Sequence, residues 1–120
     1  MLVHPQGLII TGYHPIKLNG KWVFPNTNEN FKLEHINIES VYSIGLEFGT
    51  SFLVNGVDVI GIGHGITKDP VASHPYFGTN QVIQDIFELS SDGYCVIDID
   101  QINRDPQTML VNKISKKLIN

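Results

Sequence analysis

The sequence is poor in cysteine and in charged residues, and each shortage excludes a class of protein. It has 120 residues and a single cysteine, Cys95. One cysteine excludes an internal disulfide framework and a zinc site built from several cysteines. Only 17% of the residues are charged, with 8 basic against 12 acidic side chains and a net charge of −4. Without a basic excess to neutralise a phosphate backbone, we expect no nucleic-acid partner.

Long apolar runs and targeting signals are missing as well. No run approaches the length of about 18 residues that a membrane-spanning helix needs. The opening residues, MLVHPQGLII, lack the charged start and the long apolar stretch of a signal peptide. We therefore expect no membrane partner and a cytoplasmic, reducing location. The length suits a single domain over residues 1–120, and the apolar share of 42% is ordinary for a globular protein.

Short β-branched runs separated by turn residues fill most of the chain, and this pattern favours strands over helices. A first strand is predicted over residues 7–11 and a hairpin over 17–24. The Asn19-Gly20 pair in that hairpin suits a type I′ turn, which needs a positive φ at both central positions. A meander of three strands with tight turns is predicted next, with members at 41–48, 51–54 and 57–62.

One short helix is predicted in the second half of the chain. Residues 63–78 have little periodicity and predict a long loop, and long ordered loops in small domains are often functional. Thr79-Asn80 is expected to cap a helix over 81–89, which Asp92-Gly93 then stops. The sequence therefore predicts an all-β class, mainly strands with one short helix.

The C-terminal part allows two interpretations. Residues 94–102 alternate in polarity and predict a strand. Asp105-Pro106 can open a helix that runs to the C-terminus, or it can form the first half of a type I turn over 105–108. We prefer the turn, with a return strand over 109–114, so that residues 103–120 form a terminal hairpin with a fraying end.

Histidines are the most informative residues for chemistry. Their spacing matches no zinc-binding pattern, so we expect neither a metal nor a cofactor, although a hydrolase or metal enzyme built on histidines from different loops stays an alternative. Thr11 and His14 lie three residues apart after a predicted strand. A hydroxyl and an imidazole so placed can reach one peptide bond, with His14 as the proton donor to the leaving nitrogen. The alternative is a turn with a surface histidine.

Two further sets of candidates lie in the predicted loop. His64 is flanked by glycines, which let the backbone approach a substrate closely, although a bulged strand end would show the same pattern. His74, Tyr76 and Phe77 precede the predicted helix and are candidate binding residues. Aromatic loops of this kind also plug the edge of a core, so both interpretations stay open.

Thr11-Gly12-Tyr13-His14 and the segment VYSIGLEFGTSFLVNGV, Val41 to Val57, resemble two conserved blocks of the Hint superfamily, the shared fold of inteins and of the hedgehog autoprocessing domain. The closest resemblance is to the Hint-like domain found beside von Willebrand A domains. The matching segments, between Gly7 and about Val111, are GLIITGYHPIKLNGKWVFP, LVNGVDVIGIGHG, HPYFGTNQVIQDI and RDPQTMLV. The resemblance implies a β-horseshoe of the Hint type.

The resemblance also implies self-processing of a protein chain. In that superfamily an N-terminal cysteine attacks the preceding carbonyl and converts a peptide bond into a thioester. The roles of the threonine and histidine that polarise and protonate the scissile amide would fall to Thr11 and His14, and His64 would assist resolution of the thioester. Splicing at the C-terminus is not implied, because the terminal His-Asn pair is missing.

The chain departs from the superfamily at its beginning. The initiating cysteine should precede the Thr11 motif by several dozen residues, and Cys95 comes too late to replace it. We therefore expect the C-terminal two-thirds of a Hint domain, inert alone, whose partner is a cysteine-bearing segment supplied in cis or in trans. Unpaired sheet edges would also favour a homodimer. The alternative function is a non-catalytic remnant that binds proteins or is purely structural.

Overall fold

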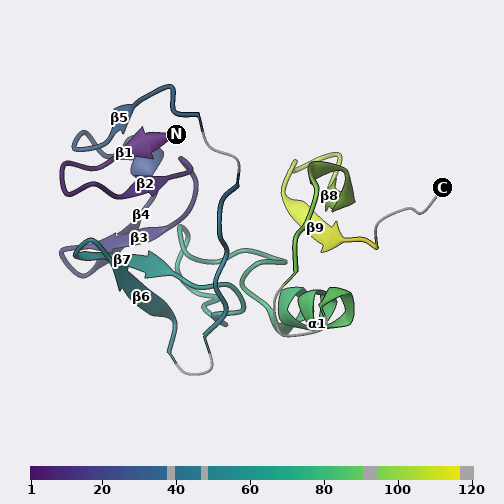
Figure 1. Cartoon of the computed structure of the whole chain (residues 1–120). Coiled ribbons are helices and arrows are strands. Elements are labelled where there is room, and N and C mark those ends of the chain that lie inside the picture. Colours follow the sequence, from purple (N-terminus) through teal and green to yellow (C-terminus); the bar gives the residue numbers. More distant parts are fainter. Residues whose placement is uncertain (38–39, 47–48, 91–94, 117–120) are drawn as a thin grey trace.

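The structure is a computed structural model of the chain and describes residues 1–37, 40–46, 49–90 and 95–116 (Figure 1). Short strands are the main regular elements among these residues, with a single α-helix in the second half of the chain, which confirms the predicted fold class. The strands are β1 (Leu2–Val3), β2 (Ile9–Ile10), β3 (Ile16–Leu18), β4 (Lys21–Val23), β5 (Lys32–Leu33), β6 (Ser51–Val54), β7 (Val57–Ile60), β8 (Ile102–Arg104) and β9 (Val111–Ile114). The helix α1 is Asn80–Leu89, and the 3₁₀ turns are η1 (Pro25–Thr27) and η2 (Ile99–Gln101).

The N-terminal lobe consists of residues 1–37 together with β6 and β7. It contains two antiparallel sheets, with strand orders β2-β1-β5 and β4-β3-β7-β6. Burial of apolar side chains between these sheets is the main force that holds the lobe together. Its core residues are Leu2, Leu8, Ile10, Ile16, Phe31, Val57 and Val59.

Asn-Gly turns close both hairpins of the larger sheet. Asn19 and Gly20 have φ values of 53° and 77°, and Asn55 and Gly56 have values of 48° and 79°. Asparagine and glycine tolerate this left-handed backbone, and two successive positive φ values give the twist that antiparallel strands need. Both hairpins were predicted, and both are confirmed.

Two other predicted strands are wrong over the residues that the structure describes. Residues 40–46 are extended but make only one bridge, a parallel one between Gly45 and Ile62. Residues 95–98 form no ladder either, and η2 separates them from β8. The remaining positions of these predictions, 47–48 and 94, lie outside the described residues. Strand-type sequences are present here without neighbouring strands to complete their hydrogen bonds.

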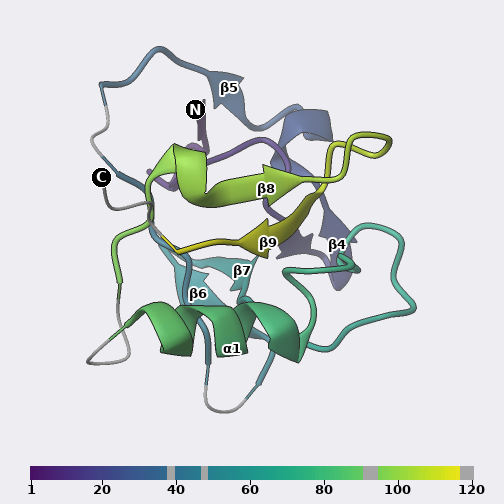
Figure 2. The ribbon, with the colours of Figure 1, turned by 90° about the vertical axis from the view of Figure 1, so that its right-hand side faces the viewer.

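The C-terminal lobe, residues 76–90 and 95–116, packs α1 against the β8–β9 hairpin, and Figure 2 shows the helix running along the hairpin. The Thr79 side chain accepts a hydrogen bond from the Gln81 N–H, which confirms the predicted helix cap. The expected stop at Asp92-Gly93 lies outside the described residues. The buried core of this lobe is Tyr76, Val82, Val111 and Ile114.

The terminal segment forms the preferred hairpin, and the alternative helix is wrong for the described residues. The Asp105 Oδ1 atom accepts the N–H groups of Gln107 and Thr108 at 2.8 and 3.0 Å. Hydrogen bonds from Thr108 and Gln107 lower the pKa of Asp105 because they stabilise the carboxylate. Met109, with φ at 63°, then turns the chain back into β9.

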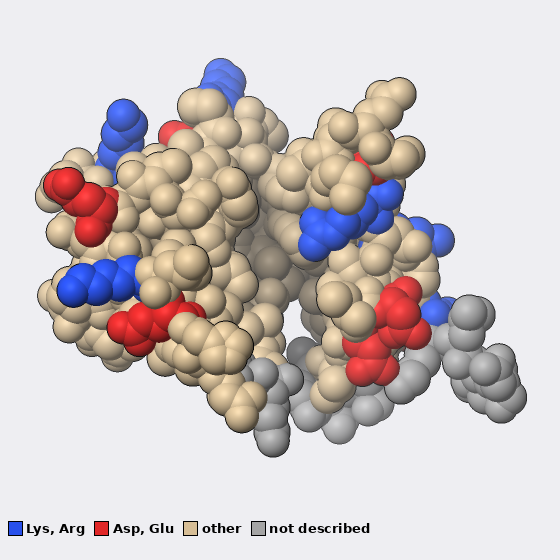
Figure 3. Space-filling model, turned by 90° about the horizontal axis from the view of Figure 1, so that it is seen from above, with Lys and Arg blue, Asp and Glu red and all other residues tan. Residues whose placement is uncertain are grey.

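A third, smaller cluster joins the N-terminal lobe to the loop that follows β7. It brings together Trp22 of β4, Ile60 of β7 and Ala72 of the loop that leads to the C-terminal lobe. Figure 3 shows a hollow between the two lobes on the face seen from above, with acidic and basic side chains interspersed around it. Within the described residues no helix is long and apolar enough to cross a bilayer.

Candidate functional site

Thr11 and His14 lie at the two ends of the turn that follows β2. The His14 N–H donates to the Thr11 carbonyl at 3.3 Å, which closes the turn. Thr11 is exposed, whereas the His14 side chain is half-buried. Ile60 N–H donates to the carbonyl of Pro15 at 3.1 Å, so the end of β7 holds the backbone beside His14 in place.

The His14 imidazole is oriented by a backbone carbonyl. Its Nε2 atom lies 2.9 Å from the Ile60 oxygen. A carbonyl oxygen only accepts, so Nε2 carries the hydrogen and Nδ1 keeps its lone pair. Burial lowers the pKa of His14, and the bond to Ile60 partly opposes this effect. Among the described residues Nδ1 has no hydrogen-bond partner, so this nitrogen is available to exchange a proton.

An open pocket of about 290 Å³ adjoins Thr11. Its wall includes apolar side chains that stay exposed, Tyr13 at 71% and Leu33 at 81%. A Cβ atom on Gly12 would come within 3.2 Å of the Asn26 Cβ, so glycine keeps the turn close to this wall. The pocket therefore gives space for chain beside Thr11.

His64 lies in a different environment from Thr11 and His14. Its Nδ1 accepts the Ile66 N–H at 2.9 Å, and its ring lies against Gly78, where an added Cβ would come within 2.9 Å of the ring. Burial lowers the pKa of His64, and a backbone hydrogen bond with Ala72 partly opposes this. No hydrogen bond or ring contact within the described part of the chain joins His64 to Thr11 or His14.

His74 and Phe77 form a local unit at the end of the same loop. His74 Nδ1 accepts the N–H groups of Tyr76 and Phe77 at 3.1 and 2.9 Å, and the rings of His74 and Phe77 lie 4.9 Å apart. Burial lowers the pKa of His74, and the positive charges of His64 and Arg104 lower it further. The backbone of the loop thus wraps around this imidazole.

Tyr76 lies in the core, which agrees with the core-edge interpretation of its aromatic loop. Its side chain is 3% exposed, and its hydroxyl donates to Asp85 Oδ2 at 2.5 Å while accepting the Ile114 N–H at 3.2 Å. Burial and the neighbouring Asp85 carboxylate raise the pKa of Tyr76. One hydroxyl therefore connects the loop, α1 and β9. Asp85 was not among the predicted residues, and only its spacing of four from Gln81, to which it is hydrogen-bonded, signals a role in the sequence.

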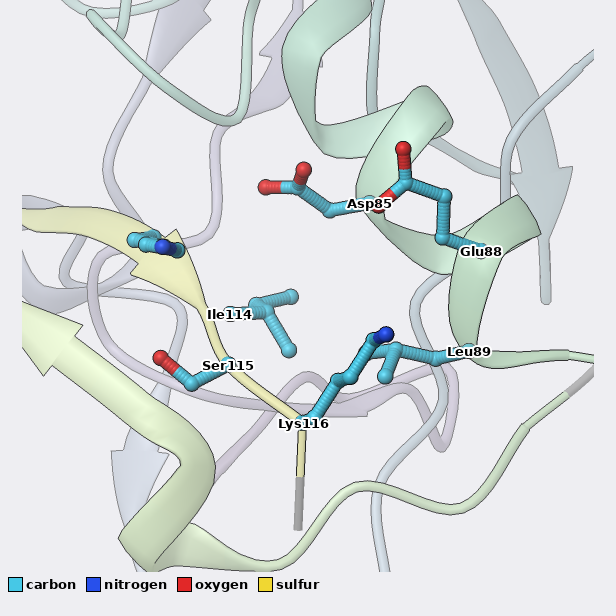
Figure 4. Close-up of a pocket in the computed structure, with 7 residues that line it drawn as sticks. Asp85, Glu88, Leu89, Ile114, Ser115 and Lys116 are labelled. Atoms are coloured by element: carbon cyan, nitrogen blue, oxygen red, sulfur yellow. The ribbon is translucent and has the colours of Figure 1, made fainter.

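A second pocket, of about 310 Å³, lies between α1 and the end of β9 (Figure 4). Figure 4 shows the Asp85 carboxylate extending into the space between helix and strand, with Lys116 near the end of the helix. None of the predicted site residues lines this pocket. In the described residues no group of three metal-ligating side chains comes together.

A family model matches the sequence of this chain. The family, described as Vint, a Hint-domain, matches residues 1–113. The mainly β architecture with one short helix is compatible with a Hint domain, and the match extends over almost the whole chain. The chain therefore belongs to this Hint-domain family. No curated protein matches the sequence.

Proposed function

We propose that this domain takes part in the self-processing of a protein chain, with His14 as the group that moves a proton at the scissile amide. Membership of a Hint-domain family supports this class of reaction. The observation that carries the proposal is the His14 ring, which the Ile60 carbonyl holds through Nε2 while Nδ1 stays free. In this scheme Thr11 polarises the same amide, and the pocket beside it gives room to the flanking chain.

The chemistry is an acyl shift from nitrogen to sulfur. A cysteine thiol gives its proton to His14 Nδ1, and the thiolate attacks the preceding carbonyl carbon to form a C–S bond. The C–N bond then breaks, and the same nitrogen of His14 returns the proton to the leaving amine. Because burial lowers the pKa of His14, its protonated form gives up the proton readily. Nε2 keeps its bond to Ile60 throughout.

The cysteine of this scheme comes from a segment that lies in cis or is added in trans. Cys95 is half-buried and follows the helix rather than the Thr11 turn. Segments 40–46 and 95–97 belong to no strand ladder, and we infer that they support binding of such a segment, because chain at the margin of a sheet can add a partner strand. Tyr42 is 82% and Val96 76% exposed there, so apolar surface is available as well.

Several finer assignments belong to this proposal and rest on the sequence alone. They are kinship with the Hint-like domains found beside von Willebrand A domains, one domain over residues 1–120, and a cytoplasmic location without nucleic-acid or membrane partners. The role of His64 in resolving a thioester also stays a prediction. Its Nδ1 accepts the Ile66 N–H, so this role needs a rearrangement of the loop.

The test is reconstitution with a cysteine-bearing N-terminal segment of a Hint domain, fused before Met1 or mixed with the chain. Mass spectrometry after hydroxylamine treatment measures cleavage through a thioester. We expect cleavage with the wild-type chain and a loss of about 100-fold or more in the rate for His14→Ala, the scale of general acid–base catalysis. His35→Ala is the matched control, because His35 is exposed and outside the site. Full activity in His14→Ala contradicts the proposal.

A second candidate function is that of a non-catalytic binding module. The exposed apolar side chains of these segments favour it, since they offer surface that another chain can cover. A second copy of the chain is the simplest partner, which makes a homodimer the expected state. Size-exclusion chromatography with light scattering tests this, and a monomer at every concentration contradicts it.

A further inference from the structure

We propose that the loop formed by residues 63–78 is an acid-sensitive latch, kept closed by the unprotonated Nδ1 atoms of His64 and His74. The proposal goes beyond self-processing, because it concerns the connection between the two lobes. Its test needs only the folded chain and no processing activity.

Hydrogen bonds fix the protonation state of the two rings. His64 Nδ1 accepts the Ile66 N–H at 2.9 Å, and His74 Nδ1 accepts the N–H groups of Tyr76 and Phe77 at 3.1 and 2.9 Å. A backbone N–H only donates, so each Nδ1 must offer a lone pair. A proton on either Nδ1 removes the acceptor and places two N–H groups against each other. Protonation and loop closure therefore exclude one another.

His64 and His74 both lie where the two ends of the loop are joined by backbone hydrogen bonds. Gly63 N–H donates to the Phe77 carbonyl at 2.7 Å, and Gly65 N–H donates to the Gly78 carbonyl at 2.8 Å. These bonds bring the two ends of the loop together on either side of His64. Gly78 lies between the His64 ring and the His74 carbonyl, because an added Cβ there would come within 2.9 and 2.8 Å of them. If one of the two imidazoles loses the hydrogen bonds that its Nδ1 accepts, the loop backbone around the other imidazole is held less firmly.

No carboxylate compensates a positive charge on either ring within the described residues. The charged groups that act on His74 are His64 and Arg104, both of which repel a proton. Asp69, in the same loop, turns its carboxylate to the N–H groups of Val71 and Ala72.

Asp85 on α1 does not neutralise the rings either. Its carboxylate is hydrogen-bonded to Tyr76 and Gln81 instead. Two imidazolium groups and Arg104 would therefore repel one another, which adds to the loss of hydrogen bonds on acidification.

The direction of the pH effect follows from burial. Burial lowers the pKa of His64 and of His74 from the usual 6.5, so the open loop binds protons more readily than the closed one. Closure is favoured above that value and is lost as the pH falls below it. His14 behaves differently, because a proton on its free Nδ1 leaves the bond to Ile60 intact.

Opening has a spectroscopic readout in the single tryptophan of the chain. The loop carries Ala72, which packs on Trp22 and Ile60, and Trp22 is 8% exposed when the loop is closed. When the loop opens, Ala72 moves away from Trp22, and the indole is exposed to water. We expect a red shift of Trp22 emission and stronger acrylamide quenching between about pH 7.5 and about pH 5, with an unchanged far-ultraviolet circular dichroism spectrum.

Asparagine variants test the role of Nδ1 itself. In His64→Asn/His74→Asn the amide oxygen takes the place of Nδ1 as acceptor but does not titrate. We expect this variant to lose the acid-induced emission shift, whereas His35→Asn keeps it. An emission that does not change with pH in the wild type, or an equal shift in the double variant, overturns the proposal. A simultaneous loss of circular dichroism also overturns it, since it means global unfolding.

If the double variant does not fold, nitrogen-15 NMR of the wild-type histidines decides. The latch requires Nδ1 of His64 and His74 to be unprotonated at neutral pH, and amide protection of Ile66 and Phe77 to fall in acid before that of the β6–β7 hairpin. A protonated Nδ1 at neutral pH on either ring, or equal loss of protection in both regions, contradicts the proposal.

Discussion

His14 donates its Nε2 hydrogen to the Ile60 carbonyl across 2.9 Å, which ties the turn after β2 to the end of β7. At His64 and His74 the ring nitrogen Nδ1 is instead an acceptor, because it receives hydrogen bonds from backbone N–H groups. The chain therefore has histidines of two kinds. His14 can take up a proton without losing its bond, and the other two cannot. This difference separates the residue suited to proton transfer from the residues suited to holding the loop.

The tautomer of His14 is the first prediction. We expect nitrogen-15 NMR at neutral pH to show hydrogen on Nε2 and none on Nδ1, because the Ile60 oxygen accepts only. Titration should give a pKa below the usual 6.5, because burial disfavours the charged ring. Hydrogen on Nδ1 at neutral pH would contradict the assigned role.

Global stability should fall in mild acid. His14, His64 and His74 all have pKa values below the usual 6.5 in the folded chain, so the unfolded chain binds protons more readily. Their contribution to stability is complete above that pH and falls as the pH drops toward the folded values. Urea unfolding at about pH 7.5 and about pH 5.5 measures the change. A higher midpoint at the lower pH would disprove this linkage.

Removal of the Tyr76 hydroxyl should destabilise the C-terminal lobe. Tyr76→Phe removes the acceptor of the buried Ile114 N–H and one of the two hydrogen bonds to the Asp85 carboxylate, which keeps the bond from Gln81. We expect the free energy of unfolding to fall by about 1–3 kcal/mol, the cost of an unsatisfied buried polar group. Tyr13→Phe is the control, since Tyr13 is 71% exposed. Equal stability of the two variants would mean that the hydroxyl is dispensable.

Gly63 should tolerate a side chain less well than Gly65, although both have a positive φ, 68° and 75°. A Cβ on Gly63 would lie 2.6 Å from Ile83 Cγ1, whereas nothing lies within 4 Å of one on Gly65. Gly65→Ala should cost about 1–2 kcal/mol for the left-handed backbone alone. We expect Gly63→Ala to cost about 1–3 kcal/mol more because of overpacking. Comparison of their urea midpoints tests the difference, and equal midpoints would rule out the clash.

Local sequence signals predicted the elements whose hydrogen bonds are local. The Asn19-Gly20 pair and the Thr79 cap act within a few residues, so their chemistry is visible in the sequence. The strand predictions failed over residues 41–46 and 95–101 because a strand needs a neighbour, and alternating polarity says nothing about where that neighbour lies. The sequence pattern at these positions is real, but in the described residues no adjacent strand completes it.

The candidate site was predictable in part for the same reason. The resemblance pointed to Thr11 and His14, yet the partner of His14 is a backbone carbonyl, which leaves no residue-specific signal at Ile60. The aromatic loop allowed either a binding role or a core-edge role for Tyr76, and the sequence could not decide between them. The contact of Tyr76 with Ile114 joins residues 38 positions apart, a distance over which a single sequence carries no pairing information.

The hydroxyl of Tyr76 also has a consequence for how the C-terminal lobe comes apart. The β8–β9 hairpin and α1 each form their own backbone hydrogen bonds, so that local unfolding of one does not by itself require unfolding of the other. The Tyr76 hydroxyl is hydrogen-bonded to Asp85 of α1 and to Ile114 of β9, so the helix and the strand depend on the same side chain. Loss of one element then weakens the other, and we expect α1 and the hairpin to open as a single cooperative unit.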